Sequence, residues 1–158
     1  KFFAPHSKTT RKRQPMKKLF GVSHKSKNVD FALLITRIAI ALLMLTHGIP
    51  KMSGLAESPV KFMDIFGMGA SLSLGLAVFA EVFCSVLLLV GLGTRFAVFP
   101  LIVTRLIAVL HVHGGDPFAK QEMAIHFLLV YVLLFILGSG KYSLDNLLVR
   151  KQRAGFLK

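Results

Sequence analysis

Long apolar segments separated by short polar stretches dominate the pattern of this chain. Four of them are visible, over residues 30–49, 72–92, 96–112 and 123–137. Each has about 15–21 residues, close to the roughly 20 that an α-helix needs to cross about 30 Å of hydrocarbon. Lipid offers no hydrogen-bond partner to an open backbone, which leaves helices or a closed β-barrel as the only spanning structures. Four segments are too few to close a barrel. The pattern therefore predicts an all-α integral membrane protein, a four-helix transmembrane bundle.

The connections between these segments differ in length. Residues 91–95 (GLGTR) and 114–117 (GGDP) are rich in Gly and Pro and predict tight turns. The fourth segment is short and is expected to gain a turn from residues 119–122. The loop 52–71 is longer. Within it, residues 59–66 (PVKFMDIF) alternate apolar and charged positions, which is compatible with either a short interfacial helix or an ordinary loop.

The charge is strongly basic but is concentrated in two tails. Lys and Arg number 20 against 7 Asp and Glu, a balance also found in nucleic-acid-binding proteins. Nine of these cations lie in residues 1–29, however, and five in residues 139–158, so we expect no nucleic-acid partner. We divide the chain into a basic N-terminal extension (1–29), a four-span membrane domain (30–148) and a basic C-terminal tail (149–158). The positive-inside rule places both termini in the cytoplasm.

The N-terminal extension has a second interpretation. It lacks acidic residues and carries Lys, Ser and Thr, as organellar transit peptides do. Met16 could also begin a shorter chain. The lone cysteine, Cys84, cannot form an intrachain disulfide or a CxxC pair, which excludes a dithiol oxidoreductase that works through its own cysteines.

Three ionisable residues interrupt the apolar segments: Arg37, Glu81 and Arg105. An unpaired charge at the bilayer centre costs at least about 2.5–3.5 kcal/mol, so such residues usually face one another. At about 1.5 Å of rise per residue, Glu81 and Arg105 both lie about 14–15 Å from a membrane surface, on the two arms of one hairpin. We expect a buried ion pair between them. Arg37 is expected to join this pair, to replace Arg105 in it, or to bind a lipid phosphate.

A second polar layer is predicted near the outer surface. The same rise places His47, His111 and His126 at similar depth. They could ligate a metal or haem, but no two share HxxxH spacing on one helix, so we expect no metal site. They could also contact a quinone head group, relay protons, or simply bond each other and water at the interface. The other candidates for this quinone or proton site are Lys51, His113, Asp116, Lys120 and Glu122.

Four motifs in this order resemble the DoxX family. They are HGIPK at 47–51, EVFCSVLLLVGLGTR at 81–95, HVHGGDPFAKQEMA at 111–124 and GSGKYSLDNLL at 138–148. The resemblance covers about residues 30–148 and implies a four-helix membrane bundle linked to quinone redox chemistry. The residues that match the family pattern are His47, Lys51, Glu81, Arg95, Asp116, Lys120 and Glu122. Arg105 has no clear counterpart in that pattern.

The resemblance implies a small accessory subunit of a quinone-linked respiratory or redox complex. The setting implied is the bacterial inner membrane, with lipid and a hetero-oligomeric complex as partners and quinone as the candidate cofactor. The alternative is a non-catalytic scaffold subunit that the basic arm anchors to a partner or to anionic lipid. The sequence has no nucleophile–base constellation and no phosphate-binding loop, so we assign no catalytic residue and expect no catalysis by the chain alone.

Overall fold

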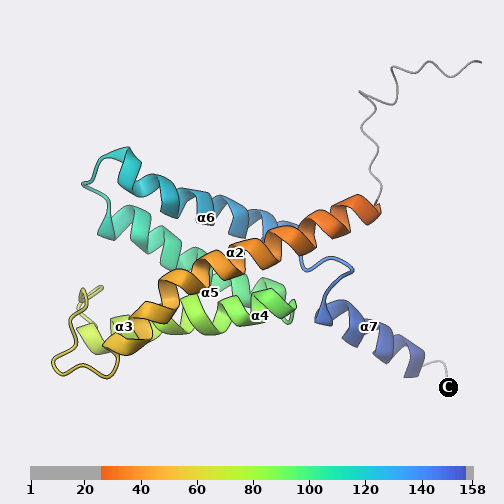
Figure 1. The fold of residues 1–158 in the computed structure, drawn as a ribbon, viewed down its shortest axis with the longest axis horizontal. Helices are drawn as coiled ribbons and strands as arrows, with labels where there is room; N and C mark the ends of the chain where they lie inside the picture. Colours follow the sequence, from red (N-terminus) through yellow and green to blue (C-terminus); the bar gives the residue numbers. More distant parts are fainter. Residues whose placement is uncertain (1–25, 156–158) are drawn as a thin grey trace, which may run out of the picture.

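The structure, a computed structural model, describes residues 26–155, and its regular elements in this range are all helices (Figure 1). They are α2 (Ser26–Gly54), α3 (Ala70–Val78), the π-helical segment η1 (Phe79–Cys84), α4 (Ser85–Val90), α5 (Thr94–Ile107), the π-helical segment η2 (Ala108–Val112), α6 (Phe118–Leu137) and α7 (Leu144–Gly155). Met16 and most of the basic extension 1–29 lie outside the described residues.

Within residues 26–155, four helices are long and apolar enough to cross a membrane, as predicted. They cover Lys27–Gly54, Ala70–Val90, Thr94–Val112 and Phe118–Leu137. The second is α3, η1 and α4 in one run, and the third is α5 followed by η2. The first continues past Pro50, and the fourth gains the predicted extra turn. Residues 59–66 contain no helix, so this segment is an ordinary loop and not the short interfacial helix that was the alternative.

The bundle is held together by one face of each span. On α2 the buried positions are Leu33, Arg37, Ile40, Ala41, Met44 and Gly48. Their spacing of three and four residues keeps them on one side of a helix with 3.6 residues per turn. They pack against η1 and α4, while α5 packs along α6. Small residues at these contacts, Ala41 and Ala97 among them, allow helices to approach closely without a driving force from water.

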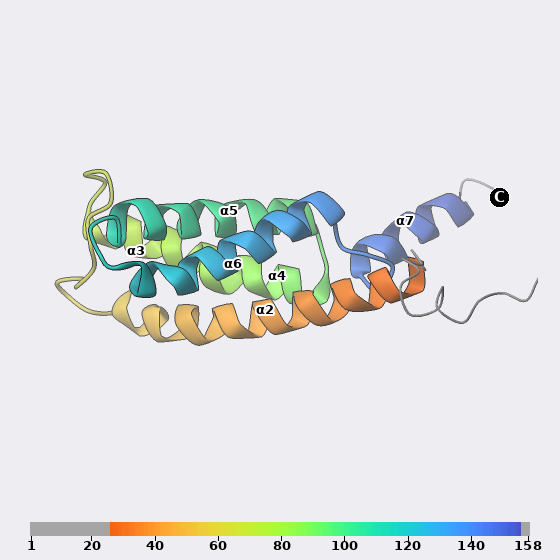
Figure 2. The same ribbon diagram turned by 90° about the horizontal axis from the view of Figure 1, so that it is seen from above.

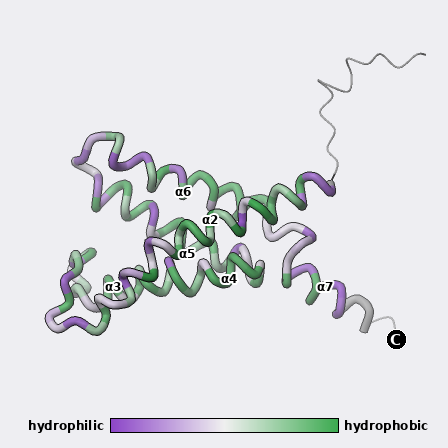
Figure 3. Tube along the Cα trace, viewed as in Figure 1, coloured by the Kyte–Doolittle hydropathy of each residue, from purple (hydrophilic) through white to green (hydrophobic). Residues whose placement is uncertain are grey.

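The outside of the bundle is as apolar as its interior. Phe96 is 86% exposed and Leu110 is 72% exposed, and many other Leu, Ile, Val and Phe side chains point outward. Figure 3 shows mainly hydrophobic colouring along the spans and mixed hydrophobic and hydrophilic colouring in the loops and α7. An apolar exterior on this scale would be unstable in water and is the surface expected toward lipid.

Helix α7 was not predicted as an element, because residues 144–148 were assigned to the end of the membrane domain and residues 149–158 to a basic tail. It lies beyond the bundle at the end where α2 begins, as Figures 1 and 2 both show. The two ends of the described chain therefore lie at the same end of the molecule, as an even number of spans requires. Its first residues are fixed to the bundle, since the Asp145 amide donates to the Gly91 carbonyl at 3.0 Å.

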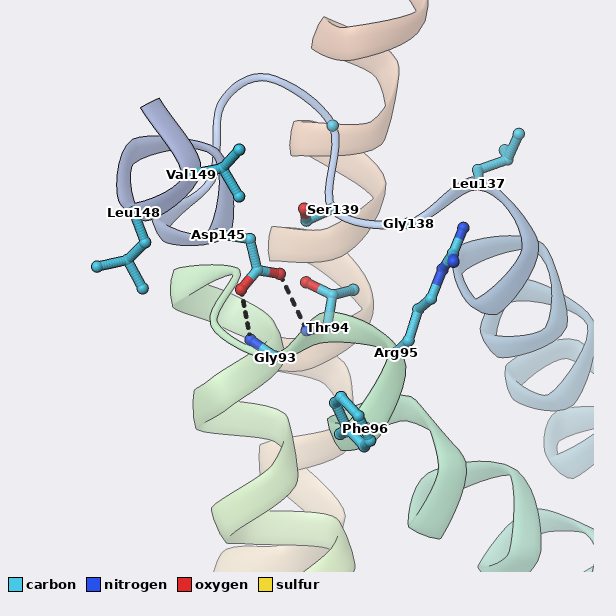
Figure 4. A pocket seen from close by; sticks show the side chains of 11 residues that line it. Gly93, Thr94, Arg95, Phe96, Leu137, Gly138, Ser139, Asp145, Leu148 and Val149 are labelled. Atoms are coloured by element: carbon cyan, nitrogen blue, oxygen red, sulfur yellow. Dashed lines mark hydrogen bonds between the residues drawn. The ribbon is translucent and has the colours of Figure 1, made fainter. Parts of the chain in front are cut away.

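Asp145 also caps the start of α5. Its Oδ1 accepts from the Gly93 amide at 2.7 Å and its Oδ2 from the Thr94 amide at 3.2 Å (Figure 4). The first amides of a helix have no partner within the helix, and a carboxylate there is also attracted by the helix dipole. One side chain of α7 thus stabilises the turn between the second and third spans.

The turn itself depends on Gly91. This residue ends α4 with φ 72°, and the amides of Gly91 and Leu92 donate to carbonyls of α4 in a Schellman arrangement. A Cβ at Gly91 would lie 2.7 Å from Arg37 Cζ and 2.8 Å from Ser143 Cβ. Gly93 also has a positive φ, 56°, but a Cβ there would meet nothing within 4 Å.

We therefore predict that Gly91→Ala destabilises the protein more than Gly93→Ala. Both variants carry the cost of a left-handed backbone, about 1 kcal/mol. Only Gly91→Ala adds a steric conflict with fixed neighbours, worth roughly 1–3 kcal/mol. Unfolding in mixed detergent micelles measures the difference. Equal stability losses would mean that the close approach of Arg37 to this turn does not matter.

Candidate functional site

The most deeply buried carboxylate of the bundle lies on η1. Glu81 is 1% exposed and is held by cations from two other spans. Lys51 Nζ, at the end of α2, donates to Glu81 Oε1 at 2.7 Å and to Oε2 at 2.8 Å. Arg105 Nη2, on α5, donates to Glu81 Oε1. One carboxylate thus joins three of the four spans, and the cluster of Lys51, Glu81 and Arg105 carries a net charge of +1.

Gly48 permits this geometry. A Cβ at Gly48 would lie 2.8 Å from Val82 Cγ2 and 2.9 Å from Glu81 Cβ. The backbone of α2 at Gly48 therefore packs directly against side chains of η1. Lys51 follows Gly48 by three residues and lies on the same face of α2. The close approach places its ammonium group at the Glu81 carboxylate. The Gly–Lys spacing in the HGIPK motif is therefore explained by packing.

The π-helical segment at Glu81 is a second local cause. A π-helical turn inserts one extra residue and rotates the side chains that follow it, and such turns are frequent at functional sites. Glu81 lies within η1, and the third span has a comparable segment, η2, closed by the His113 amide donating to Ala108 at 2.9 Å. Apolar periodicity does not reveal these segments, so sequence reasoning missed them.

A cavity of about 340 Å³ opens above this cluster. Lys51, Glu81 and Arg105 contribute its polar side, together with Ser73, Thr104 and His113. Apolar side chains form the rest: Phe62, Met63, Ile65 and Met68 from the loop, and Leu76, Ala77, Ile107, Ala108 and Val112 from the spans. The 55–69 loop thus supplies one wall, although sequence analysis had assigned it no part in the site. The Ser73 hydroxyl accepts from the Ile65 amide at 3.0 Å and holds that wall in place.

The cationic side of the cavity retains unused hydrogen-bond donors. Lys51 has three N–H groups, of which two reach Glu81. Arg105 Nε is buried and has no hydrogen-bond partner among the described residues. Arg105 also lies 5.9 Å from the centre of the Phe127 ring, a contact that helps to retain a buried cation. The cavity can therefore donate to an acceptor-bearing ligand without breaking the ion pairs.

His113, at the edge of this cavity, belongs to a network in the loop before α6. Its Nδ1 lies 2.9 Å from Asp116 Oδ2, and Lys120 Nζ lies 3.4 Å from Asp116 Oδ1. The Gln121 amide donates to the carbonyls of His113 and Asp116 at 2.8 and 3.0 Å. The hydrogen bond from His113 is the main cause that lowers the pKa of Asp116, and Lys120 adds to it. Three of the predicted candidates, His113, Asp116 and Lys120, thus form one unit.

The other three candidate histidines, His47, His111 and His126, do not contact one another. His47 makes an edge-to-face contact with Phe127, with ring centres 5.8 Å apart, and His111 lies against Phe66 at 5.2 Å. His126 and the exposed Glu122 line a separate groove between α2 and α6. The structure therefore does not bring His47, His111 and His126 to the Glu81 cavity, because equal depth does not give equal direction around a helix. Among residues 26–155, no three His, Cys, Asp or Glu side chains gather closely enough to hold a metal.

Arg37 does not join the Glu81 cluster, does not replace Arg105 in it and does not face lipid, which corrects the three expectations for it. It is 1% exposed at the opposite end of the bundle. Its Nη1 donates to the Ser139 carbonyl, and its Nη2 donates to the Tyr142 carbonyl at 2.8 Å. Arg37 therefore holds the segment that leads from α6 to α7. The GSGKYSLD motif was the available signal, since such a loop has carbonyls that need donors.

We predict that Glu81→Gln destabilises the bundle by about 3–5 kcal/mol, because it leaves the nearly enclosed Arg105 without a counter-charge. Glu122→Gln is the matched control: its side chain is exposed on α6, and we expect a change within about 0.5 kcal/mol. Unfolding in mixed micelles measures both. The double variant Glu81→Gln/Arg105→Gln should recover part of the loss, because the two charges leave together. Additive losses in the double variant would contradict a direct ion pair.

Comparison with known proteins gives one match. The DoxX family model matches residues 32–114, just over half of the chain. This range includes Lys51, Glu81 and Arg105, the three residues of the cluster. No curated protein and no solved structure matches the chain.

Proposed function

This chain belongs to the DoxX family, and from that premise we propose that it is a small accessory subunit of a quinone-linked redox complex in a membrane. The quinone head group is placed in the cavity above Lys51, Glu81 and Arg105. The observation that carries the proposal is the combination of a buried, donor-rich ionic cluster with apolar walls in one cavity.

The residues present fit a quinone. A quinone ring is apolar and carries two carbonyl acceptors, and the cavity offers the third N–H group of Lys51 as a donor, with the Arg105 guanidinium beside it. Its volume of about 340 Å³ is within the range of small-molecule sites, roughly 300–1,000 Å³. The side chains of Met63, Met68 and Leu76 suit the ring and the start of an isoprenoid tail.

The chain's own part is binding and orientation. A bound quinone supplies the capacity to accept electrons and protons. Lys51 and Arg105 fix its carbonyl groups, Glu81 holds both cations in place, and the loop wall restricts water. His113, hydrogen-bonded to Asp116 at the cavity edge, is the group best placed to exchange protons with the aqueous side. His47, His111, His126 and Glu122 have no role in this proposal, because they do not line the cavity.

We place both termini in the cytoplasm and the cavity near the outer leaflet of a bacterial inner membrane. The support is the distribution of cations: Lys27, Arg95, Lys141 and Arg150 lie at the α7 end of the bundle, with the basic tails attached there. The loops at the cavity end have nearly balanced charges, as the positive-inside rule expects for the translocated side.

We predict that Ala77→Phe weakens quinone binding by tenfold or more, because its ring would fill the cavity without removing any charge. Titration calorimetry with a short-chain quinone and the protein in lipid nanodiscs measures the affinity. Ala119→Phe is the matched control, since Ala119 lines the separate groove on α6 and its variant should bind normally. Unchanged binding by Ala77→Phe would remove the quinone from this cavity.

The scaffold function is the second candidate, and one observation favours it. Both oxygens of Glu81 already bond to cations of this chain, so the cluster can act purely to lock three spans together. Purification in mild detergent separates the two functions. Co-purifying quinone supports the proposed subunit, whereas a large stoichiometric partner without quinone supports the scaffold. In that case the basic N-terminal arm would be the first segment to delete.

A further inference from the structure

A second pocket, of about 560 Å³, lies at the base of α7, at the opposite end of the bundle from the Glu81 cluster. We propose that it binds the phosphate of an anionic glycerophospholipid, with Arg95 as the cation. The residues that carry the argument are Thr94, Arg95, Phe96, Asp145, Leu148 and Val149, which Figure 4 shows around the pocket.

The pocket lies at the membrane depth where lipid phosphates are found. The third span begins at Thr94 and the fourth ends at Leu137, and both residues line this pocket. The pocket therefore lies at the boundary between hydrocarbon and water, where lipid phosphates are found. Basic pockets between transmembrane helices at this level are known to hold anionic head groups.

The charge of Arg95 is the second argument. Its guanidinium is exposed and makes one hydrogen bond, from Nη2 to the Ile136 carbonyl at 3.2 Å. No carboxylate among residues 26–155 forms an ion pair with it. Asp145 lines the same pocket, but its two oxygens accept from the amides of Gly93 and Thr94, and its charge also attracts the buried Arg37. Arg95 thus has a charge and several donors left for a phosphate, which a guanidinium can bind with two parallel hydrogen bonds.

The pocket also contains an unsatisfied polar group. Thr94 is 1% exposed, and its hydroxyl oxygen has no hydrogen-bond partner among the described residues. Buried hydroxyls are normally bonded, because leaving one unpaired costs about 1–3 kcal/mol. Thr94 lines the pocket, and a phosphate or glycerol oxygen would accept a hydrogen bond from this hydroxyl after the side chain rotates toward the pocket.

The apolar walls suit a lipid better than a free anion. Phe96, 86% exposed, follows Arg95 directly and lies on the lipid side of the third span. Leu148 and Val149 of α7 are about half exposed on the other side of the pocket. Acyl chains would cover these surfaces, whereas an inorganic phosphate would leave them in water. A second groove beside α7 is lined by Lys27, Lys141 and Arg150 and by Asp30, which pairs with Lys141, so its surplus of cations adds positive potential at this end.

Native mass spectrometry of the whole protein, released from detergent micelles, tests the proposal with phosphatidylglycerol as the probe. We expect phosphatidylglycerol to bind and diacylglycerol of the same chain length, which lacks the phosphate, not to bind. Arg95→Gln should weaken phosphatidylglycerol binding about tenfold, the effect of losing one charge-assisted contact. Arg95→Lys should bind phosphatidylglycerol with an affinity between those of the parent and Arg95→Gln, because it keeps the charge but loses the planar guanidinium group. Thr94→Val, which keeps the shape of the side chain, should weaken binding several-fold.

Lys61→Gln is the matched control, since it removes one exposed cation from the loop at the other end of the bundle and should bind phosphatidylglycerol normally. Equal binding by Arg95→Gln and the parent would overturn the site. Displacement of the lipid by millimolar inorganic phosphate would also overturn it, because the pocket would then take free anions. The quinone titration in nanodiscs is independent of both results, so failure of one proposal leaves the other standing.

Discussion

The structure depends on how a few charges are satisfied where water is absent. Lipid cannot solvate a guanidinium or a carboxylate, so each ionic group inside the bundle must find its partners within the protein. Glu81 does so by binding Lys51 and Arg105 from two other spans, and Arg37 does so by donating to backbone carbonyls. Apolar packing alone gives little direction to helices in lipid, because the tails are as apolar as the side chains. The ionic contacts therefore decide which faces of these spans meet.

The two ionic sites use different counter-groups, and this gives them different properties. At Glu81 two cations share one carboxylate, which leaves one positive charge and several donors beside a cavity. At Arg37 the charge is divided over carbonyls of the segment before α7, with Asp145 close by, and Gly91 closes the space against the guanidinium. The first arrangement can accept a ligand. The second is filled by the chain itself and serves to fix α7 and the turn at residues 91–95.

Much of the fold could be predicted from the sequence, but less of the site. The lengths of the apolar segments located all four spans, because a transmembrane helix has to cross a hydrocarbon layer of known thickness. The helical rise per residue gives the depth of a residue in the membrane, and it predicted that Glu81 and Arg105 lie at the same depth. The structure shows these two side chains in contact. Depth says nothing about direction around the helix axis. This is why His47, His111 and His126 share a level without sharing a site, and why Lys51 was assigned to a histidine layer. The π-helical segments and the loop wall of the cavity leave no periodic signal.

The net charge of the Glu81 cluster connects structure and function. A cluster built only to join helices would be most stable when neutral, because any surplus charge costs free energy in a medium of low dielectric constant. Here a carboxylate faces two cations, and the surplus lies beside a cavity with apolar walls rather than against packed side chains. Lys51 is a third exposed, so part of its charge reaches solvent, whereas Arg105 is nearly enclosed. A ligand with strong acceptors would lower the cost of keeping Arg105 there. Under the proposed function, the surplus charge serves to bind such a ligand.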